Sequence, residues 1–358
     1  MINPYIGHPS QLGGVEEIRL IGGRGDGMRL FQLRNGAGLE MTVCADRCAD
    51  IYRLSYKGDN MGYFSPSGYV TPGYYDDKGD GWLKSFTAGF LTTCGLVAVG
   101  SPCTDNGEDL PLHGTIGNTP CERIYWDEDE ENYYIRATVS DSRIFSRKLV
   151  LKRTISVSKT EGKFTVSDII ENQGDTESPV MILYHMNMGY PLLSENAVVE
   201  VASVEVTPRN DHAAEDLATW NKMLTPTPNF EEQCYYHKMG QEGRASIYNP
   251  DIRKGLTISF DPQSLDHFTE WKMMGYRDYV LGLEPGNCTP DGRDVMRREG
   301  KLKFLKPGER IAYEVSIKLY EKKGDRQCLL LPAGRMSWQY IKKLQRKAGS
   351  FLACVAKT

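Results

Sequence analysis

The chain has 358 residues, of which 40 % are hydrophobic and 25 % are charged. This composition is close to the globular average, so it argues against a disordered chain and supplies enough apolar material for a large core. The formal net charge of −4 leaves no basic surplus that would attract a phosphate backbone, and we therefore expect no nucleic-acid partner.

Membrane association and secretion are not indicated by the sequence. No run approaches the roughly 18 to 20 consecutive apolar residues that a membrane-spanning helix needs. Residues 1–14 also lack the basic and then apolar layout of a signal peptide. We therefore expect a cytoplasmic protein that makes no contact with a membrane.

The cysteines are expected to be reduced thiols. They number nine and share no repeated short spacing, and a chain of this length does not need disulfides to hold its core. Cys44 and Cys48 are four positions apart, but no second pair stands at the spacing of a zinc site. We expect most of these side chains to be small buried apolar groups, and we expect no structural metal.

Alternation of apolar and polar residues with a period of two is far more frequent along the chain than helical periodicity, which favours β-strands. It is clearest at residues 148–157 and 311–319. Further strand candidates are residues 39–44, 133–139, 164–170, 180–185, 198–206, 256–260 and 279–283. The entirely polar run at residues 127–132 predicts a solvated hairpin tip.

No repeat or low-complexity segment divides the chain, so we expect an all-β fold with one domain over residues 1–325. Residues 326–358 are expected to form a helical extension, because Trp338, Ile341 and Leu344 recur at helical spacing with basic residues between them. This helix would pack on the domain or on a second subunit, which leaves a homodimer open.

Three distant segments each place one ionisable side chain among aromatic or turn-forming residues. They are LPLHGTIGN around His113, ILYHMNMGYP around His185, and VLGLEPGNC around Glu284. Two imidazoles and one carboxylate can move a proton onto one sugar oxygen while removing a proton from another. Taken alone, each residue also has a structural interpretation, as a hydrogen-bonded histidine of the core or of a loop, or as a glutamate that satisfies a turn.

The strand pattern gives these side chains a direction. If residues 180–187 are extended, His185 and Asn187 lie on the same face of the strand. Glu284 comes just before Pro285 and Gly286, where the next apolar strand ends, so its carboxylate can face a cleft without being sealed in the core.

Longer segments surround these motifs. They are WLKSFTAGFLTTCGL at residues 82–96, GEDLPLHG at 107–114, PVMILYHMNMGYPLL at 179–193, EWKMMGYRDYVLGLEPGNC at 270–288, and the pair Gly292-Arg293. Together, and in this order, they resemble the aldose 1-epimerase-like family of the galactose mutarotase superfamily. The resemblance implies a mostly antiparallel β-supersandwich whose carbohydrate site lies on the concave face of a large sheet.

The resemblance also implies the activity, which is the interconversion of sugar anomers without a metal or another cofactor. Ring opening and closing need one group that protonates the ring oxygen and one that removes the proton of the C1 hydroxyl. By similarity, His185 is the acid, Glu284 is the base, and His113 binds the small-molecule carbohydrate.

Sugar hydroxyls are expected to be bound by forked, ammonium or amide side chains, for which the candidates are Arg47, Asn187, Lys272, Asn287 and Arg293. Aromatic candidates for the C–H side of the sugar ring are Trp271, Tyr184 and Trp82. For Arg47 and Arg293 a plain salt bridge is the alternative, and for Trp271 a place in the core.

The sequence departs from the family at two points. Residues 46–51 resemble the pattern Asp-Arg-Gly-x-Asp-Ile, but Cys48 stands where glycine is usual. No residue matches the family's additional sugar-binding aspartate, for which Asp251 and Asp266 are the only candidates.

Two other functions stay open. The same fold can serve as a carbohydrate-binding or sensor protein, in which catalysis plays no part. His113, His185 and Glu284 also have the composition of a two-histidine, one-carboxylate metal site, as in a metal-dependent sugar isomerase. The sequence does not identify the sugar, nor whether it is neutral, acidic or phosphorylated.

Overall fold

The computed structural model describes residues 4–321, which belong to one compact unit. The predicted helical extension at residues 326–358 lies outside the described residues. Every strand pair in the sheets of this part of the chain is antiparallel, in agreement with the mostly antiparallel fold that the family resemblance implies.

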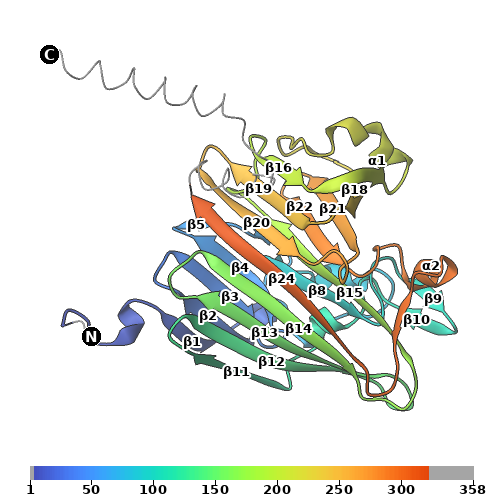
Figure 1. Cartoon of the computed structure of the whole chain (residues 1–358), viewed down its shortest axis with the longest axis horizontal. Coiled ribbons are helices and arrows are strands. Elements are labelled where there is room, and N and C mark those ends of the chain that lie inside the picture. The colour runs from blue at the N-terminus through green and yellow to red at the C-terminus, as the bar shows by residue number, and fades with distance from the viewer. Residues whose placement is uncertain (1–3, 322–358) are drawn as a thin grey trace. The chain divides into compact units, whose positions relative to one another are not determined.

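The largest sheet has eight strands and contains the two segments with the clearest alternation (Figure 1). In spatial order its strands are β11 (Arg123–Glu128), β12 (Asn132–Ser142), β13 (Lys148–Ser158), β14 (Lys163–Asn172), β24 (Arg310–Glu321), β20 (Lys254–Phe260), β19 (Gly243–Asn249) and β16 (Val198–Val201). In β13, Leu149, Leu151, Ile155 and Val157 are buried, because alternate residues of a strand face the core.

The predicted hairpin tip is confirmed. Strands β11 and β12 pair up to Glu128 and Tyr133. At the tip, Oδ1 of Asp129 accepts the backbone N–H groups of Glu131 at 2.8 Å and Asn132 at 2.7 Å. These exposed polar residues therefore close a turn instead of forming a core.

A seven-stranded sheet carries the segments with the ionisable motifs. Its path is β17 (Ser203–Pro208), β18 (Gln233–Met239), β21 (His267–Met274), β22 (Tyr279–Gly286), β15 (Ser178–Met188) and β23 (Lys303–Leu305), and β8 (Leu91–Leu96) also pairs with β15. The prediction of one strand at residues 198–206 is wrong, because the chain passes at Ala202 from β16 in one sheet to β17 in the other. Alternation cannot reveal this change, since it reports which residues face a core but not which sheet they join.

The remaining elements are smaller. A five-stranded sheet near the N-terminus has the order β1 (Gly14–Arg19), β2 (Arg29–Arg34), β3 (Leu39–Cys44), β4 (Asp50–Tyr56) and β5 (Asp59–Asn60). Two short pairs are β6 (Tyr63–Phe64) with β7 (Ala88–Gly89), and β9 (Cys103–Asp105) with β10 (Glu108–Leu110). The described α-helices are short, α1 at Asp211–Glu215 and α2 at Arg293–Arg298.

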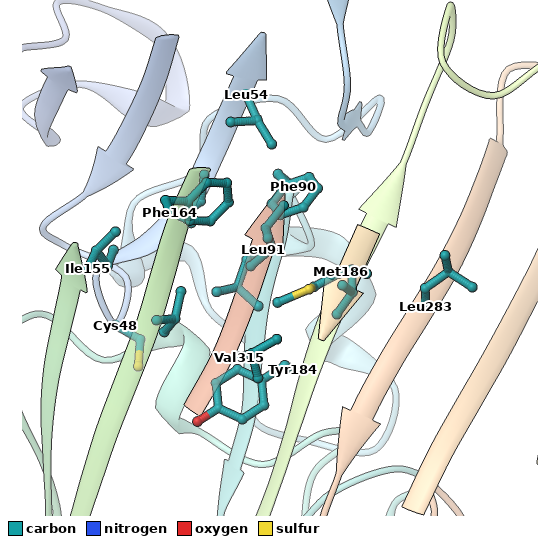
Figure 2. Packing of buried hydrophobic residues seen from close by; sticks show 14 of the residues in the cluster. Cys48, Leu54, Phe90, Leu91, Ile155, Phe164, Tyr184, Met186, Leu283 and Val315 are labelled. Atoms are coloured by element: carbon teal, nitrogen blue, oxygen red, sulfur yellow. The ribbon is translucent and has the colours of Figure 1, made fainter. Parts of the chain in front are cut away.

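The main core collects apolar side chains from all three large sheets. The rings of Phe90 and Phe164 meet edge to face with centroids 5.9 Å apart. Figure 2 shows both rings in this core together with Leu54, Ile155, Tyr184, Met186, Leu283 and Val315. Burial of these side chains supplies most of the free energy that holds the sheets together.

Strand β15 is buried on both faces. Ile182, Tyr184 and Met186 pack in the main core, whereas Leu183 on the opposite face packs in a second, smaller cluster. Since side chains alternate along a strand, His185 lies on the same face as Leu183 and away from the main core.

Candidate active site

The register of neighbouring strands places two of the three motif residues opposite each other. β15 pairs with β22 so that Asn187 faces Gly282, and this register sets His185 opposite Glu284. On the other side of β22, Glu284 pairs with Thr269 of β21. Residues that face each other on neighbouring strands have side chains in contact.

A pocket of about 180 Å³ lies over this face of the sheet. Its walls come from the strands and from the loops that carry His113, Arg209 and Glu232. Its lining includes Trp82, Phe86, His113, His185, Arg209, Glu232, Thr269, Trp271 and Glu284. Glu232 is exposed, so the pocket is open to solvent.

His185 and Glu284 are in direct contact at this pocket. Nδ1 of the imidazole lies 3.2 Å from Oε1 of the carboxylate, with 6 % and 2 % of the two side chains exposed. Both atoms are enclosed and neither has a hydrogen-bond partner, so the 3.2 Å approach is a close contact and not an aligned hydrogen bond. Because these two atoms face each other, Nε2 of His185 and Oε2 of Glu284 are the atoms that can meet a bound molecule.

Burial disfavours the charged form of both groups. It lowers the pKa of His185 to about 4, an effect that the neighbouring Asn187 side chain opposes. Burial also raises the pKa of Glu284 well above its usual range, with the nearby Glu232 acting in the same direction and Arg209 against it. A single proton between the two groups therefore suits the ligand-free site.

Aromatic rings enclose the imidazole of His185. The centroid of its ring lies 5.4 Å from Phe86, 5.5 Å from His113 and 5.2 Å from Trp271. Trp82 stacks on Phe86 with centroids 4.2 Å apart and packs behind His113. These rings keep water away from His185 and account for its lowered pKa.

His113 is held in an unusual backbone conformation with φ of 57°. Its N–H donates to the carbonyl of Gly100 at 2.9 Å, and its carbonyl accepts from Gly95 at 3.1 Å. Nδ1 accepts the N–H of Gly100 at 3.3 Å, so the neutral ring carries its proton on Nε2 and can donate it to a ligand. Burial lowers the pKa of His113 well below its usual range, as do the nearby His185 and Arg209.

Arg209 and Glu232 are pocket residues that the sequence analysis missed. Nη2 of Arg209 donates to Ser101 Oγ at 3.0 Å and to the carbonyl of Pro290 at 3.3 Å, and its Nε lies 3.3 Å from Asp291. Glu232 accepts a 2.7 Å hydrogen bond from the indole N–H of Trp271. Both stand in polar loop segments without periodicity, so no local pattern of the sequence indicated them.

Arg47 does not reach the pocket, and its interpretation as a sugar ligand is not supported. Its guanidinium is buried and donates to the backbone carbonyls of Gly117 at 2.7 Å, Ser85 at 2.9 Å and Val70 at 3.1 Å. Arg47 therefore links three loop segments through hydrogen bonds to their backbone. It makes neither the predicted sugar contact nor the alternative salt bridge.

Cys48 keeps the backbone geometry that glycine would favour. Its φ is 53°, and that of Ala49 is 52°, so both residues adopt the left-handed conformation. Cys48 therefore takes a conformation in which glycine is the more usual residue.

Arg293 and Asn287 are structural as well. Arg293 is buried and pairs with Asp105 at 2.6 Å and Glu108 at 2.8 Å, which is the alternative of a plain salt bridge. Asn287 accepts the N–H of Ile182 at 2.8 Å and donates to the hydroxyl of Tyr313 at 2.9 Å. Neither side chain lines the pocket.

Three further candidates lie next to the site or behind it. Asn187 donates to the carbonyl of His185 at 2.9 Å and so supports the histidine. Lys272 is buried on the far face of β21, where Nζ donates to Thr219 O at 3.4 Å. Tyr184 faces the core, and its hydroxyl donates to Asp168 at 2.8 Å. Alternation along the strands separates Lys272 and Tyr184 from the pocket.

Neither candidate for the additional aspartate lines the pocket. Asp251 accepts a 2.9 Å hydrogen bond from Asn196, and Asp266 forms an ion pair with Lys303. Glu232 is the acidic side chain that the structure brings to the pocket in addition to Glu284.

The side chains of the site are not arranged as metal ligands. Among residues 4–321, no group of three or more His, Cys, Asp and Glu side chains is placed to hold a metal ion. Nδ1 of His113 accepts a backbone N–H, and Nδ1 of His185 faces Glu284.

Comparisons with known proteins agree with this fold. The model of a family described as a domain of unknown function (DUF4432) matches residues 25–319, and the chain therefore belongs to this family. No curated protein matches the sequence. Within residues 4–321, no helix combines the length and the apolar character needed to span a membrane.

Solved structures similar to the chain identify the fold as galactose mutarotase-like, which confirms the predicted fold class. A candidate aldose 1-epimerase from Klebsiella pneumoniae shares 26 % identity with a TM-score of 0.83, covering 88 % of this chain and 85 % of that one. A galactose 1-epimerase from Lactobacillus acidophilus shares 13 % identity with a TM-score of 0.61, covering 87 % and 99 %. A galactose mutarotase-like protein from Clostridium acetobutylicum shares 12 % identity with a TM-score of 0.64, covering 87 % and 100 %.

Proposed function

We propose that this chain, as a member of the DUF4432 family with a mutarotase-like fold, is an aldose 1-epimerase that interconverts the anomers of a reducing sugar. The observation that carries the proposal is the contact between His185 and Glu284 at a pocket open to solvent. The names of the similar proteins from Klebsiella pneumoniae and Lactobacillus acidophilus support the same reaction class.

The first step prepares the two groups. In the ligand-free pocket the shared proton rests on Glu284, since burial disfavours both charges. Transfer of this proton from Oε1 to Nδ1 across the 3.2 Å contact produces an imidazolium beside a carboxylate. His185 then has an acidic N–H at Nε2, and Glu284 has a basic oxygen at Oε2.

The second step opens the ring. Nε2 of His185 gives its proton to the ring oxygen as Oε2 of Glu284 removes the proton of the C1 hydroxyl. The bond between C1 and the ring oxygen breaks, and a carbonyl forms at C1. After rotation about C1–C2, the reverse transfers close the ring on the opposite face, so the pair ends with the one proton it began with.

Other pocket residues hold the sugar and exclude water. The N–H at Nε2 of His113 donates a hydrogen bond to a sugar oxygen. The carboxylate of Glu232 accepts a hydrogen bond from a sugar hydroxyl. Trp271 supplies an aromatic surface, fixed by its hydrogen bond to Glu232. General acid and base groups placed in this way each contribute roughly 10² to 10⁴ in rate.

The test is the rate of anomer equilibration of freshly dissolved aldoses, measured by polarimetry or NMR exchange. The protein accelerates at least one sugar, and His185→Ala and Glu284→Gln each lower kcat/KM by at least about 10². Matched controls are the half-buried His212 and the exposed Glu299, neither of which lines the pocket, and their replacement by Ala and Gln leaves the rate within about twofold.

Two outcomes contradict the proposal. One is the absence of any acceleration across neutral, acidic and phosphorylated sugars, which favours a carbohydrate-binding or sensor protein. The other is sugar turnover that survives Glu284→Gln unchanged.

A further inference from the structure

A second cavity of about 550 Å³ adjoins the 180 Å³ pocket. The two share the side chains of Leu83, Phe86, Glu232 and Trp271 as common walls. His185 and Glu284 line only the smaller one, which we call the inner cavity, and the larger one is the outer cavity. The outer cavity therefore lies directly beside the cavity that holds the proton-transfer pair, with Trp271 in their common wall.

Aromatic surfaces dominate the junction of the two cavities. Trp271 lies between them, its ring edge-on to His185 at 76° and its indole N–H bonded to Glu232 at 2.7 Å. Phe86 is a wall of both cavities, and Tyr63 adds a third ring to the outer one. Such rings pack against the C–H faces of sugars.

The polar groups of the outer cavity are hydroxyls and carboxylates. Ser65, Ser67, Glu232 and Asp278 line it, and the hydroxyl of Tyr63 donates to Asp278 at 3.3 Å. These groups can accept hydrogen bonds from sugar hydroxyls. The combination of flat rings and hydroxyl acceptors fits a pyranose better than it fits a purely apolar group.

Charge excludes an anionic occupant. The side chains that line the outer cavity include two carboxylates and no Lys, Arg or His. In the inner cavity, Arg209 is the cation, and its guanidinium is already engaged by Asp291 at 3.3 Å and Ser101 at 3.0 Å. A phosphate or carboxylate in the outer cavity would meet two carboxylates with no cation among the lining side chains.

We propose that the substrate is the reducing end of a neutral oligosaccharide, with the reducing sugar in the inner cavity and the next sugar unit in the outer cavity. This inference rests on the proposed function, because that reaction requires the anomeric carbon to lie at His185 and Glu284. The glycosidic bond lies on the far side of the reducing sugar and so points toward Trp271. A monosaccharide fills the inner cavity alone and leaves the outer cavity to water.

The first experiment compares each monosaccharide with disaccharides that carry it at the reducing end, such as glucose with maltose, cellobiose and lactose. For at least one pair, kcat/KM for anomer exchange is higher for the disaccharide by at least about 10-fold, the factor given by ~1.4 kcal/mol. If monosaccharides are turned over and no disaccharide exceeds its partner, the outer subsite is wrong while the epimerase assignment stands.

A second experiment uses variants of Met273, which lines only the outer cavity. Met273→Trp fills that cavity and lowers kcat/KM of the preferred disaccharide at least about 10-fold more than that of the monosaccharide. Met273→Leu is the matched control and keeps the preference. An equal loss for both sugars in the Trp variant, with the preference kept, contradicts the assignment.

Binding separates this inference from the proposed function. Calorimetric titration of the Glu284→Gln variant with the same sugars gives a disaccharide Kd at least about 10-fold below that of the monosaccharide. This result together with no catalysis by the wild-type protein supports the two cavities as an oligosaccharide site and rejects the epimerase. Equal dissociation constants reject the outer subsite.

Discussion

A β-carbon on Gly282 would lie 2.2 Å from Oε1 of Glu284, closer than folded proteins tolerate. The carboxylate folds back over the glycine two positions earlier in β22, and this brings it to His185 on the neighbouring strand. Gly282 therefore makes room for the base, although it carries no functional group.

Replacement of Gly282 by Ala is expected to displace the carboxylate and not to unfold the protein, because the nearest atom is the end of a flexible side chain. The next contact, Cβ of Trp271 at 3.0 Å, requires a shift of only a few tenths of an ångström. A misplacement of about 1 Å costs on the order of 10² in kcat. Steady-state polarimetry measures this loss, and thermal melting measures the stability. Gly73→Ala, whose new Cβ would meet nothing closer than 3.7 Å, is the matched control. A fully active Gly282→Ala variant would show that the position of the carboxylate is not critical.

The pH dependence of anomer exchange is expected to be bell-shaped, because the His185–Glu284 pair works with one proton. Activity is lost below about pH 4, where His185 accepts a second proton. Activity is also lost as the pH rises through the raised pKa of Glu284, because the pair then loses its only proton. The pH profile of kcat/KM reports both limbs.

Glu232 and Arg209, which lie near Glu284, shift the alkaline limb of the pH profile in opposite directions. Burial is the main cause of the raised pKa of Glu284, and Glu232 raises it further whereas Arg209 lowers it. Glu232→Gln is therefore expected to shift the alkaline limb to lower pH, and Arg209→Met to higher pH, whatever either change does to kcat. The exposed Glu231→Gln leaves it in place. Shifts of the same sign in both variants would show that another group sets this limb.

A buried carboxylate outside the pocket affects stability. Glu270 is 0 % exposed and lies 3.3 Å from Nε2 of His237, and burial raises its pKa. The folded state then holds a proton more tightly than the unfolded state, so the stability from this group is present at low pH and is lost as the pH rises above 4.5. Each unit of pKa difference corresponds to about 1.4 kcal/mol.

Glu270→Gln removes this ionisation and keeps the shape of the side chain. The difference in melting temperature between the variant and the wild type is expected to grow in favour of the variant from pH 5 to pH 9. The exposed Glu299→Gln shows no such trend. A constant loss of stability in Glu270→Gln at all pH values would mean that Glu270 acts as a charged partner of His237.

The core contains a buried ion cluster that joins the sheets. Arg153 of β13 is fully buried and binds Asp168 of β14 at 2.7 Å and Asp50 of β4 at 3.0 Å. Arg153→Met leaves two buried carboxylates without their cation and is expected to lower the free energy of unfolding by about 3–5 kcal/mol. Arg136→Met removes a partly exposed ion pair with Asp127 and is expected to change the free energy of unfolding by less than about 1 kcal/mol. Urea unfolding measures both, and equal effects would contradict the difference in burial.

The sequence predicted the β-class, several strands of the two largest sheets and the motif residues because these depend on local patterns. Alternation gives the buried face of a strand wherever one side packs on a core, as in β12 and β13. His113, His185 and Glu284 were identified because each stands in a distinctive segment, and the structure brings all three to one pocket.

The sequence did not predict the hydrogen-bond and ion-pair partners of most polar side chains, because these partners come from distant parts of the chain. Arg47 and Arg293 have the residue type of sugar ligands, but the fold buries them against backbone carbonyls and carboxylates. Arg209 and Glu232 stand in loops without a recognisable pattern, and the fold turns them into the pocket.

Side-chain period, turn residues and apolar content are properties of a few neighbouring positions, so the sequence alone determined the β-class and several of the strands. Strand register and loop packing bring together residues that are far apart in the sequence, such as His185 and Glu284. The tertiary structure alone decided that these two side chains meet, that Gly282 leaves space for the carboxylate, and that an outer cavity continues the pocket.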